Sequence, residues 1–236
     1  YDISDADRLT SRAYMDWRDG RSSAEISAYS FQGLRATDDP GLTPLVLPEA
    51  NLRYLLADTW LGGEVGLNAN VLSLTRARGP DTQRFSAGVD WRRPEIFDGG
   101  QAVTFFATLR GDLYRLGDPD AVFNAPGSED GDILTRAVVY AGVDARWPFV
   151  RQTEGGSTQI IEPIAQVILA PYGDGPDGIP NEDSQSLEFD DTNLFSPIKF
   201  TGLDLVESGP RANLGVRFAQ YFPEGASFEV LAGVEL

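Results

Sequence analysis

Apolar and polar residues alternate along most of the chain. In residues 84–92, for example, Phe85, Ala87, Val89 and Trp91 alternate with polar residues and glycine. Successive side chains on a strand point to opposite faces, so this period of two predicts strands with one apolar and one polar face. No segment sustains the period of about 3.6 residues typical of an amphipathic helix. We therefore predict an all-β fold of about ten antiparallel strands. They cover residues 7–17, 22–32, 47–57, 62–74, 82–92, 101–114, 134–147, 159–170, 211–221 and 226–236.

The predicted strands are long, and the connections between them are unequal. A strand of about ten residues, tilted in the bilayer, crosses its hydrocarbon core. Three connections are long (residues 33–46, 116–133 and 171–210), and residues 75–81 form one of modest length. Short turns lie between these longer connections, as in outer-membrane barrels with short turns at one rim and long loops at the other. The pattern predicts part of the wall of a large transmembrane β-barrel, with the three long connections outside the cell.

Aromatic residues support the same prediction. All four tryptophans fall at or beside strand ends that are joined by short turns. Aromatic rings concentrate where a membrane meets water, because the ring is apolar and its polar edge needs a partner. The alternative is a scattered set of core anchors. We expect an aromatic girdle made of Trp17, Trp60, Trp91, Trp147 and Tyr221.

Composition excludes several kinds of function. The chain has 19 Lys and Arg against 36 Asp and Glu, a formal net charge of −17. Nucleic-acid binding needs clustered cations, so no nucleic-acid partner is expected. The chain contains no cysteine and no histidine, which removes thiol chemistry, the commonest general base and the commonest metal ligands. No cofactor and no enzymatic activity are expected.

The connection between residues 171 and 210 carries the most distinctive motif. Residues 180–184 read Pro-Asn-Glu-Asp-Ser, and residues 189–196 read Phe-Asp-Asp-Thr-Asn-Leu-Phe-Ser. This ordered run resembles the LptD family, the lipopolysaccharide (LPS)-assembly proteins of Gram-negative outer membranes. Shorter stretches, including residues 31–35 and 161–166, extend the resemblance over nearly the whole chain. The resemblance marks Pro180, Asn181, Glu182, Asp183, Ser184, Phe189, Asp190, Asp191, Thr192, Asn193, Leu194, Phe195, Gly202, Asp204, Glu207, Gly209, Arg211 and Asn213.

The resemblance implies a location and a set of partners. Residues 1–236 would be a single region, a fragment of the C-terminal barrel domain, in the Gram-negative outer membrane. Its partners would be LPS, outer-membrane lipids, an LptE-like plug lipoprotein, and an LptA-like periplasmic bridge that docks through an N-terminal domain outside this chain. The family commonly has an aromatic residue and an arginine where this chain has Leu203 and Leu205, and residues 197–199 replace a typical Leu-Asn-Arg. We therefore expect the loop to lack a cationic contact that its relatives use.

Charged residues on the polar faces of the strands allow two interpretations. They form either a lattice of ion pairs inside the barrel or a contact surface for the phosphates and sugars of LPS. The candidate luminal face consists of Arg84, Asp90, Arg92, Arg110, Arg136, Asp144, Arg146 and Arg217.

The acidic loop residues also admit chemical interpretations. Asp190 and Asp191 with Glu188 could act as an acid–base pair, but without histidine we expect them to bond to loop backbone or luminal cations instead. A Ca²⁺ site is the weaker alternative to simple solvation, because the spacing matches no EF-hand loop. That second acidic group comprises Asp174, Asp177, Glu182 and Asp183.

The leading functional hypothesis is a non-enzymatic translocon that inserts LPS into the outer leaflet. The alternative is a diffusion porin or a specific outer-membrane channel, which would share the strands but not the ordered loop motif. An outer-membrane hydrolase and a soluble β-sandwich are weaker rivals. The sandwich would also alternate apolar and polar residues, because one face of each of its sheets meets a core.

Overall fold

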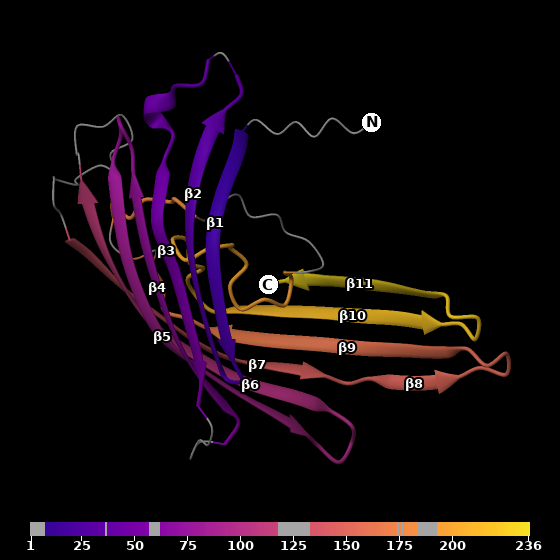
Figure 1. Ribbon diagram of the computed structural model, residues 1–236. Helices are drawn as coiled ribbons and strands as arrows, with labels where there is room; N and C mark the ends of the chain where they lie inside the picture. Colours follow the sequence, from indigo (N-terminus) through magenta and orange to yellow (C-terminus); the bar gives the residue numbers. More distant parts are fainter. Residues whose placement is uncertain are drawn as a thin grey trace.

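The computed structural model describes residues 8–35, 37–56, 62–117, 133–173, 175, 177–183 and 193–236. These residues form one antiparallel sheet, curved like part of a barrel wall and open at β1 and β11 (Figure 1). The all-β prediction is confirmed. The strands are β1 (Arg8–Asp19), β2 (Ser22–Gly33), β3 (Leu45–Leu55), β4 (Glu64–Thr75), β5 (Asp81–Ile96), β6 (Ala102–Gly117), β7 (Ile133–Arg146), β8 (Phe149–Gln152), β9 (Thr158–Leu169), β10 (Arg211–Tyr221) and β11 (Ser227–Glu235).

Strands that follow one another in sequence lie side by side in the sheet, except that β7 and β8 are consecutive along the same side of β9. Because every pair is antiparallel, the connections alternate between two rims. The strand ends that flank residues 34–44, 118–132 and 170–210 lie at one rim, which we call the long-loop rim. The opposite end, where short turns such as residues 97–101 join the strands, is the short-turn rim. In the described residues, no helix is long and apolar enough to cross a membrane.

The sheet has eleven strands rather than the ten predicted, because the chain splits at Trp147 and Pro148. Arg146 pairs with Ile164 and Phe149 pairs with Ile161, so the register across β7, β8 and β9 continues without a shift. Trp147 and Pro148 stand opposite Pro163 and Glu162 in that register. Proline has no backbone N–H to donate to the ladder. The two prolines therefore interrupt the pairing without changing which residues share a face.

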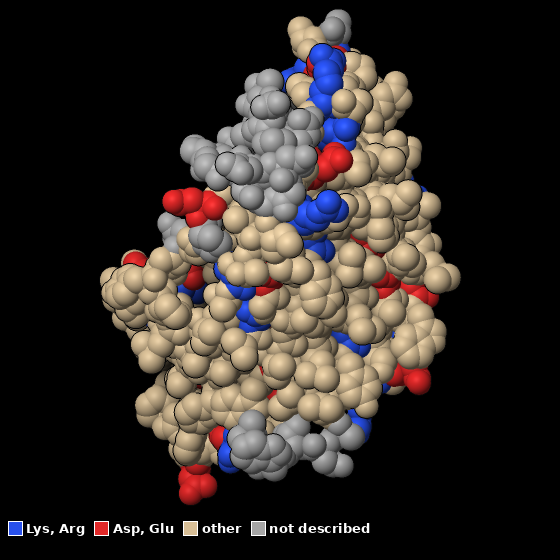
Figure 2. All heavy atoms as spheres, turned by 90° about the vertical axis from the view of Figure 1, so that its left-hand side faces the viewer, with Lys and Arg blue, Asp and Glu red and all other residues tan. Residues whose placement is uncertain are grey.

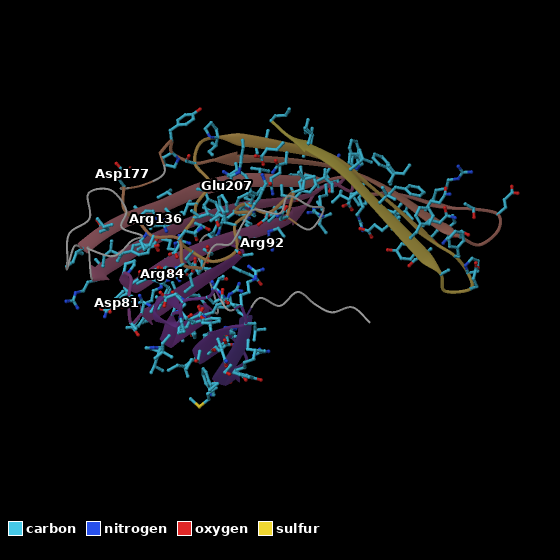
Figure 3. The ribbon with its side chains drawn as sticks, turned by 90° about the horizontal axis from the view of Figure 1, so that it is seen from above. Asp81, Arg84, Arg92, Arg136, Asp177 and Glu207 are labelled. Atoms are coloured by element: carbon cyan, nitrogen blue, oxygen red, sulfur yellow. The ribbon has the colours of Figure 1, made fainter. Side chains whose placement is uncertain are left out.

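The two faces of the sheet have opposite chemical character. Apolar side chains on one face are open: Leu109 is 57% exposed and Phe85 is 49% exposed. Their polar neighbours on the other face are covered, and Arg84 is only 3% exposed. Figure 3 places Arg84 and Arg136 on the concave side of the sheet, which we call the inner face. Uncharged residues cover most of the surface seen in Figure 2. Apolar residues outside and charged residues inside reverse the usual pattern of a water-soluble sheet.

The inner face also holds a small apolar cluster near the long-loop rim. Val46, Leu72 and Leu74 are buried there and pack with Tyr29 and Phe31. Within the described residues, no second sheet packs against the first. A β-sandwich needs two sheets around one core, so that alternative is wrong for this part of the chain.

Candidate functional site

The connection that carries the LptD-like motif lies against the inner face. In Figure 1 its orange segments run inside the curve of the sheet, behind β2 and β3. Two groups of contacts attach it to the strands. We call the first group the latch, and it joins the loop residues Glu182, Asp183, Leu203 and Asp204 to Arg76, Arg84, Arg110, Tyr114 and Arg136. The latch also includes Asp112, which pairs with Arg110 and Arg136.

Arg84 of β5 is the centre of the latch. Its Nη1 donates to Asp183 Oδ2 and to Asp204 Oδ1, both at 2.5 Å. Its Nη2 donates to Asn70 Oδ1 at 2.9 Å. The side chains of Arg84 and Asp204 are 2% and 1% exposed, so this ion pair is shielded from water. One guanidinium on a strand thus binds two carboxylates that lie twenty-one residues apart in the loop.

Two further arginines bind the backbone of the loop. Arg110 of β6 and Arg136 of β7 flank the buried Asp112 at 2.9 and 2.8 Å. Each also donates to the carbonyl oxygen of Leu203, at 2.8 and 2.6 Å. Arg136 Nη1 reaches the carbonyl oxygen of Asp204 at 2.5 Å. Because the strands carry more positive charge here than Asp112 balances, their spare N–H groups are directed at loop oxygens.

Tyr114 and Arg76 complete the latch at its two sides. The Tyr114 hydroxyl donates to Asp204 Oδ1 at 3.0 Å. Arg76, just after β4, makes a bidentate pair with Glu182 at 2.9 and 2.6 Å. Planar two-point pairing is among the stronger charge-assisted contacts in proteins. In the whole latch, four guanidinium groups face four carboxylates.

Local loop geometry brings the two carboxylates together. Asp183 accepts hydrogen bonds from the backbone N–H of Leu203 and of Asp204, at 3.0 Å each. Gly202 precedes them with φ +83°, and a Cβ there would lie 2.4 Å from Asp183 Oδ1. A left-handed backbone and the lack of space both require glycine at this position. The residue before Asp204 contributes only through its backbone, so these contacts make no demand on the Leu203 side chain.

Burial and charge shift the pKa values of the loop groups. Burial alone would raise the pKa of Asp183, but the Arg84 charge and the two backbone N–H bonds outweigh it and lower that pKa. Burial raises the pKa of Asp204, and Arg84 opposes the shift. Burial lowers the pKa of Lys199, against the attraction of Glu207.

The second group of contacts, which we call the anchor, fixes the loop to β9, β10 and β11. Leu194 and Phe195 fill the space above two facing glycines. A Cβ on Gly233 would lie 2.5 Å from Leu194 Cδ2, and one on Gly215 would lie 2.7 Å from Phe195 Cζ. Gln166 Nε2 donates to the Phe195 carbonyl oxygen at 2.8 Å. The loop is therefore attached at two places on different strands.

Charged residues extend the anchor. The buried Lys199 lies 3.6 Å from Glu207 and also pairs with Glu235 of β11. Arg211, the first residue of β10, lies 3.0 Å from Glu207. Asn213 is fully buried and donates to Gln166 Oε1 at 2.8 Å. From Leu203, Leu205 and residues 197–199 the sequence predicted that the loop lacks a cationic contact, yet Lys199 supplies a cation at residues 197–199.

A separate charged group lies on the inner face nearer the short-turn rim. Arg146 Nε lies 2.9 Å from Asp144 Oδ1, and Arg217 lies 3.1 Å from Glu162 and 3.3 Å from Glu229. We call these five residues the open cluster, because the Arg146 and Glu229 side chains are 42% and 51% exposed. All five lie on strands. They pair with one another as in an ion-pair lattice, which is one of the two interpretations that the sequence left open.

The other predicted inner-face residues have different surroundings. Asp90 accepts hydrogen bonds from Asn68 and Thr108, at 2.5 and 2.6 Å, instead of pairing with an arginine. Arg92 is exposed, and its register places it on the same face as Asp90.

The remaining predicted residues belong to the loop. Gly209 has φ +80° and packs against Tyr172. Pro180, Asn181 and Asn193 lie in the described part of the loop. Ser184, Phe189, Asp190, Asp191 and Thr192 lie outside the described residues, as does Glu188.

The acidic group considered for Ca²⁺ does not assemble in the described residues. Glu182 and Asp183 bind Arg76 and Arg84, and Asp177 is exposed. Asp174 lies outside the described residues. The described part of the chain holds no group of three acidic residues placed to bind a metal ion.

Three of the five predicted girdle residues lie on the outer face at the short-turn rim. Trp91 donates its indole N–H to the Gly62 carbonyl oxygen, and Trp147 donates to that of Gly99, both at 2.9 Å. Trp17 is 52% exposed on β1. Tyr221 is at the same rim, but it lies four residues after Arg217 on β10. This even spacing places it on the inner face with Arg217. Trp60 is outside the described residues.

Sequence reasoning did not foresee that the loop motif and the inner-face arginines form one site. It assigned Arg84, Arg110 and Arg136 to the strands and Asp183 and Asp204 to the loop, without connecting them. The available signal was charge, because these three strand positions carry arginine. Among the described residues of β5–β7, Asp112 is the only carboxylate next to these arginines on the inner face. An unbalanced buried charge requires a partner from elsewhere in the chain.

Comparisons with known proteins point to one family. The model of the LptD family, described as LPS transport system D, matches residues 2–233. The LPS-assembly protein LptD of Thiobacillus denitrificans is 25% identical over 222 residues, which cover 91% of this chain and 28% of that protein. LptD of Albidiferax ferrireducens is 24% identical over 216 residues, 88% of this chain and 26% of that protein. LptD of Acinetobacter baylyi is 31% identical over 96 residues, 41% of this chain and 12% of that protein. The chain spans about a quarter of the length of the first and second of these curated relatives.

Proposed function

The chain belongs to the LptD family, and on that premise we propose that it forms part of the wall of an outer-membrane translocon that inserts LPS into the outer leaflet. LptD relatives carry the name LPS-assembly protein. The family is one of transport and assembly, so no covalent step is assigned to these residues. The membrane would be the Gram-negative outer membrane.

The observation that supports this proposal is the reversed polarity of the sheet. Side chains such as Leu109 and Val139 on the outer face are 57% and 45% exposed. Charged side chains such as Arg84 and Asp112 are buried on the inner face. Lipid is a favourable surrounding for the first set, and a wet or protein-filled lumen suits the second. A polar saccharide headgroup would then be shielded inside while its acyl chains stay near lipid.

We also propose the partners that the family resemblance implies. These are an LptE-like plug lipoprotein and an LptA-like periplasmic bridge that docks through a further domain. The open cluster supports a polar partner in the lumen, because its side chains are accessible and both signs of charge are present. A plug and a headgroup would both find hydrogen-bonding groups on that surface.

A diffusion porin is the alternative function. A porin needs a continuous aqueous passage, whereas here the latch and the anchor fasten a long loop across the inner face. That attachment favours a gated or filled lumen. Conductance of the reconstituted intact protein separates the two, because a porin would give a large steady current and the proposed translocon would not.

Two measurements test the proposal in the intact protein. A nitroxide attached through Val89→Cys should be reached by oxygen dissolved in lipid, and one attached through Arg92→Cys should be reached by a water-soluble nickel complex. Both positions are exposed on β5, three residues apart on opposite faces, so they form a matched pair. Water at Val89 would contradict the membrane assignment.

The second measurement addresses LPS itself. Depletion of the intact protein should lower the LPS that an impermeant antibody detects on the cell surface, while LPS synthesis continues. Unchanged surface LPS after depletion would contradict the transport role, even if the nitroxide experiment places the sheet in the membrane.

A further inference from the structure

The latch has the composition of an anion-binding site whose ligand is the protein's own loop. Without the loop, the described strands contribute Arg84, Arg110, Arg136 and Tyr114, balanced only by Asp112. This leaves two uncompensated positive charges on a surface that is almost fully buried when the loop is in place. In the structure, Asp183 and Asp204 supply the two missing negative charges.

The donors converge on four loop oxygens, of which three belong to the consecutive residues Leu203 and Asp204 and the fourth is Asp183 Oδ2. The Leu203 carbonyl oxygen accepts from Arg110 and Arg136. The Asp204 carbonyl oxygen accepts from Arg136, and Asp204 Oδ1 accepts from Arg84 and Tyr114. A phosphate monoester presents three strong acceptor oxygens close together and carries a charge of about −1.5 to −2 near neutral pH. Guanidinium groups in a fixed arrangement are the side chains best suited to such a group.

We propose that Arg84, Arg110, Arg136 and Tyr114 form a binding site for a phosphate group, and that Asp183 and Asp204 occupy it until such a ligand displaces them. The loop and the phosphate bind the same donors, so the two states exclude each other. This inference rests on the proposed function, because it takes the phosphorylated headgroup of LPS as one source of the ligand. Free phosphate is the other source.

The anchor makes displacement feasible without loss of the loop. Leu194 and Phe195 attach the loop to β10 and β11 through contacts that do not involve the latch arginines. Opening the latch would therefore leave the loop tethered. The latch contacts described above are made by charged and hydrogen-bonding groups, and these donors can bind the oxygens of a phosphate in place of the loop oxygens.

The test uses purified intact protein carrying Asp183→Asn and Asp204→Asn together. This change keeps the shape of the loop and removes its two charges. Binding of inorganic phosphate, measured by calorimetry or phosphorus NMR, should be at least about tenfold tighter than to the unmodified protein, because the competing carboxylates are gone. Adding Arg84→Gln and Arg136→Gln to that variant should abolish the gain.

A matched control has the same change in net charge at the open cluster. The double variant Asp144→Asn, Glu229→Gln also makes the inner face more positive by two charges, but away from the latch. No gain in phosphate binding is expected there. A gain equal to that of the latch variant, or a gain that survives loss of both arginines, would overturn the proposal and show only general attraction of anions.

A second variant guards against failure of the first to assemble. Gly202→Ala displaces Asp183 by crowding and leaves every charge in place. It should also increase phosphate binding, and correct barrel formation is checked by heat-dependent migration in gels. No gain in either assembled variant would overturn the proposal.

Separate arms identify the source of the phosphate and keep this inference apart from the proposed function. Phosphorylated LPS binding the latch variant more tightly than both dephosphorylated LPS and inorganic phosphate would assign the headgroup. Equal binding of inorganic phosphate and phosphorylated LPS would assign free phosphate. Normal LPS delivery without phosphate binding would overturn the site alone. Phosphate binding without LPS delivery would overturn the proposed function alone.

Discussion

The latch and the open cluster are both made of arginines and carboxylates on the inner face, yet they balance charge in different ways. In the open cluster, every partner is on a strand of the sheet. In the latch, the strands carry an excess of arginine, and the loop supplies the missing carboxylates. The open cluster is therefore complete before any loop folds over it. The latch is complete only when residues far apart in sequence come together.

Burial gives this difference its energetic weight. The Arg84 and Asp204 side chains are 2% and 1% exposed, whereas Arg146 is 42% exposed. Removing one partner of a buried pair leaves an uncompensated charge, at a cost of about 3–5 kcal/mol. An exposed pair contributes about 0–1 kcal/mol, because water replaces the lost partner. The same chemistry should thus be essential in one region and dispensable in the other.

The largest effect is expected from Asp204→Ala. This change removes one of the two carboxylates bound to Arg84 and the acceptor of the Tyr114 hydroxyl. It also removes Asp204 Oδ2, which accepts a hydrogen bond from the backbone N–H of Glu182 at 2.8 Å. We expect a loss of about 3–5 kcal/mol in unfolding free energy, measured in the intact protein by urea titration in detergent.

Asp177→Ala is the control for that experiment. Asp177 is in the same loop but is exposed, so its loss should change the unfolding free energy by no more than about 0.5 kcal/mol. If the two variants had equal stability, the latch would not hold the loop to the sheet.

A smaller effect is expected from Gly202→Ala, which acts on the latch through backbone shape alone. The alanine Cβ would clash with Asp183, and the φ of +83° is unfavourable for any residue except glycine. We expect a cost of about 1–3 kcal/mol and faster cleavage of the loop by added protease. Gly173→Ala separates the two causes, because Gly173 also has positive φ (+122°), but a Cβ added there would meet no atom of the described residues within 4 Å. Equal cleavage of both variants would show that crowding at Asp183 is unimportant.

The two regions also differ in how well the sequence predicted them. Alternation such as Arg84, Phe85 and Ser86 predicts the strands and their faces, because that property is local to a few residues. An ion-pair lattice was one of two interpretations of the polar faces, and its pairs in the open cluster are similarly local: Arg217 and Glu229 are on adjacent strands joined by a short turn. The register of a short hairpin follows from its length.

The latch was not predicted, because Asp204 and Arg84 are 120 residues apart. No local pattern specifies which strand a long loop will contact, since the closure of so long a segment depends on tertiary packing. Tyr221 was assigned to the girdle because it is an aromatic residue at a strand end. The alternation of side chains along β10 was not considered, and it places Tyr221 on the inner face. The split at Trp147 follows from Pro148 and Pro163, which come to adjacent positions of the ladder only after β7, β8 and β9 have paired.

The smallest effect is expected from Arg146→Gln in the open cluster. Arg146 lies 2.9 Å from Asp144 and 3.6 Å from Glu162, but Glu162 keeps Arg217 at 3.1 Å when Arg146 is lost. Asp144 still accepts from Gln166 at 3.4 Å. Because each carboxylate retains a partner and water reaches the site, the unfolding free energy should fall by less than about 1 kcal/mol. The difference should shrink further in high salt, which screens exposed pairs most strongly. Arg84→Gln, measured in parallel, should cost several times more and should respond little to salt. Equal costs for the two arginine variants would mean that burial beneath the loop does not distinguish the latch from the open cluster.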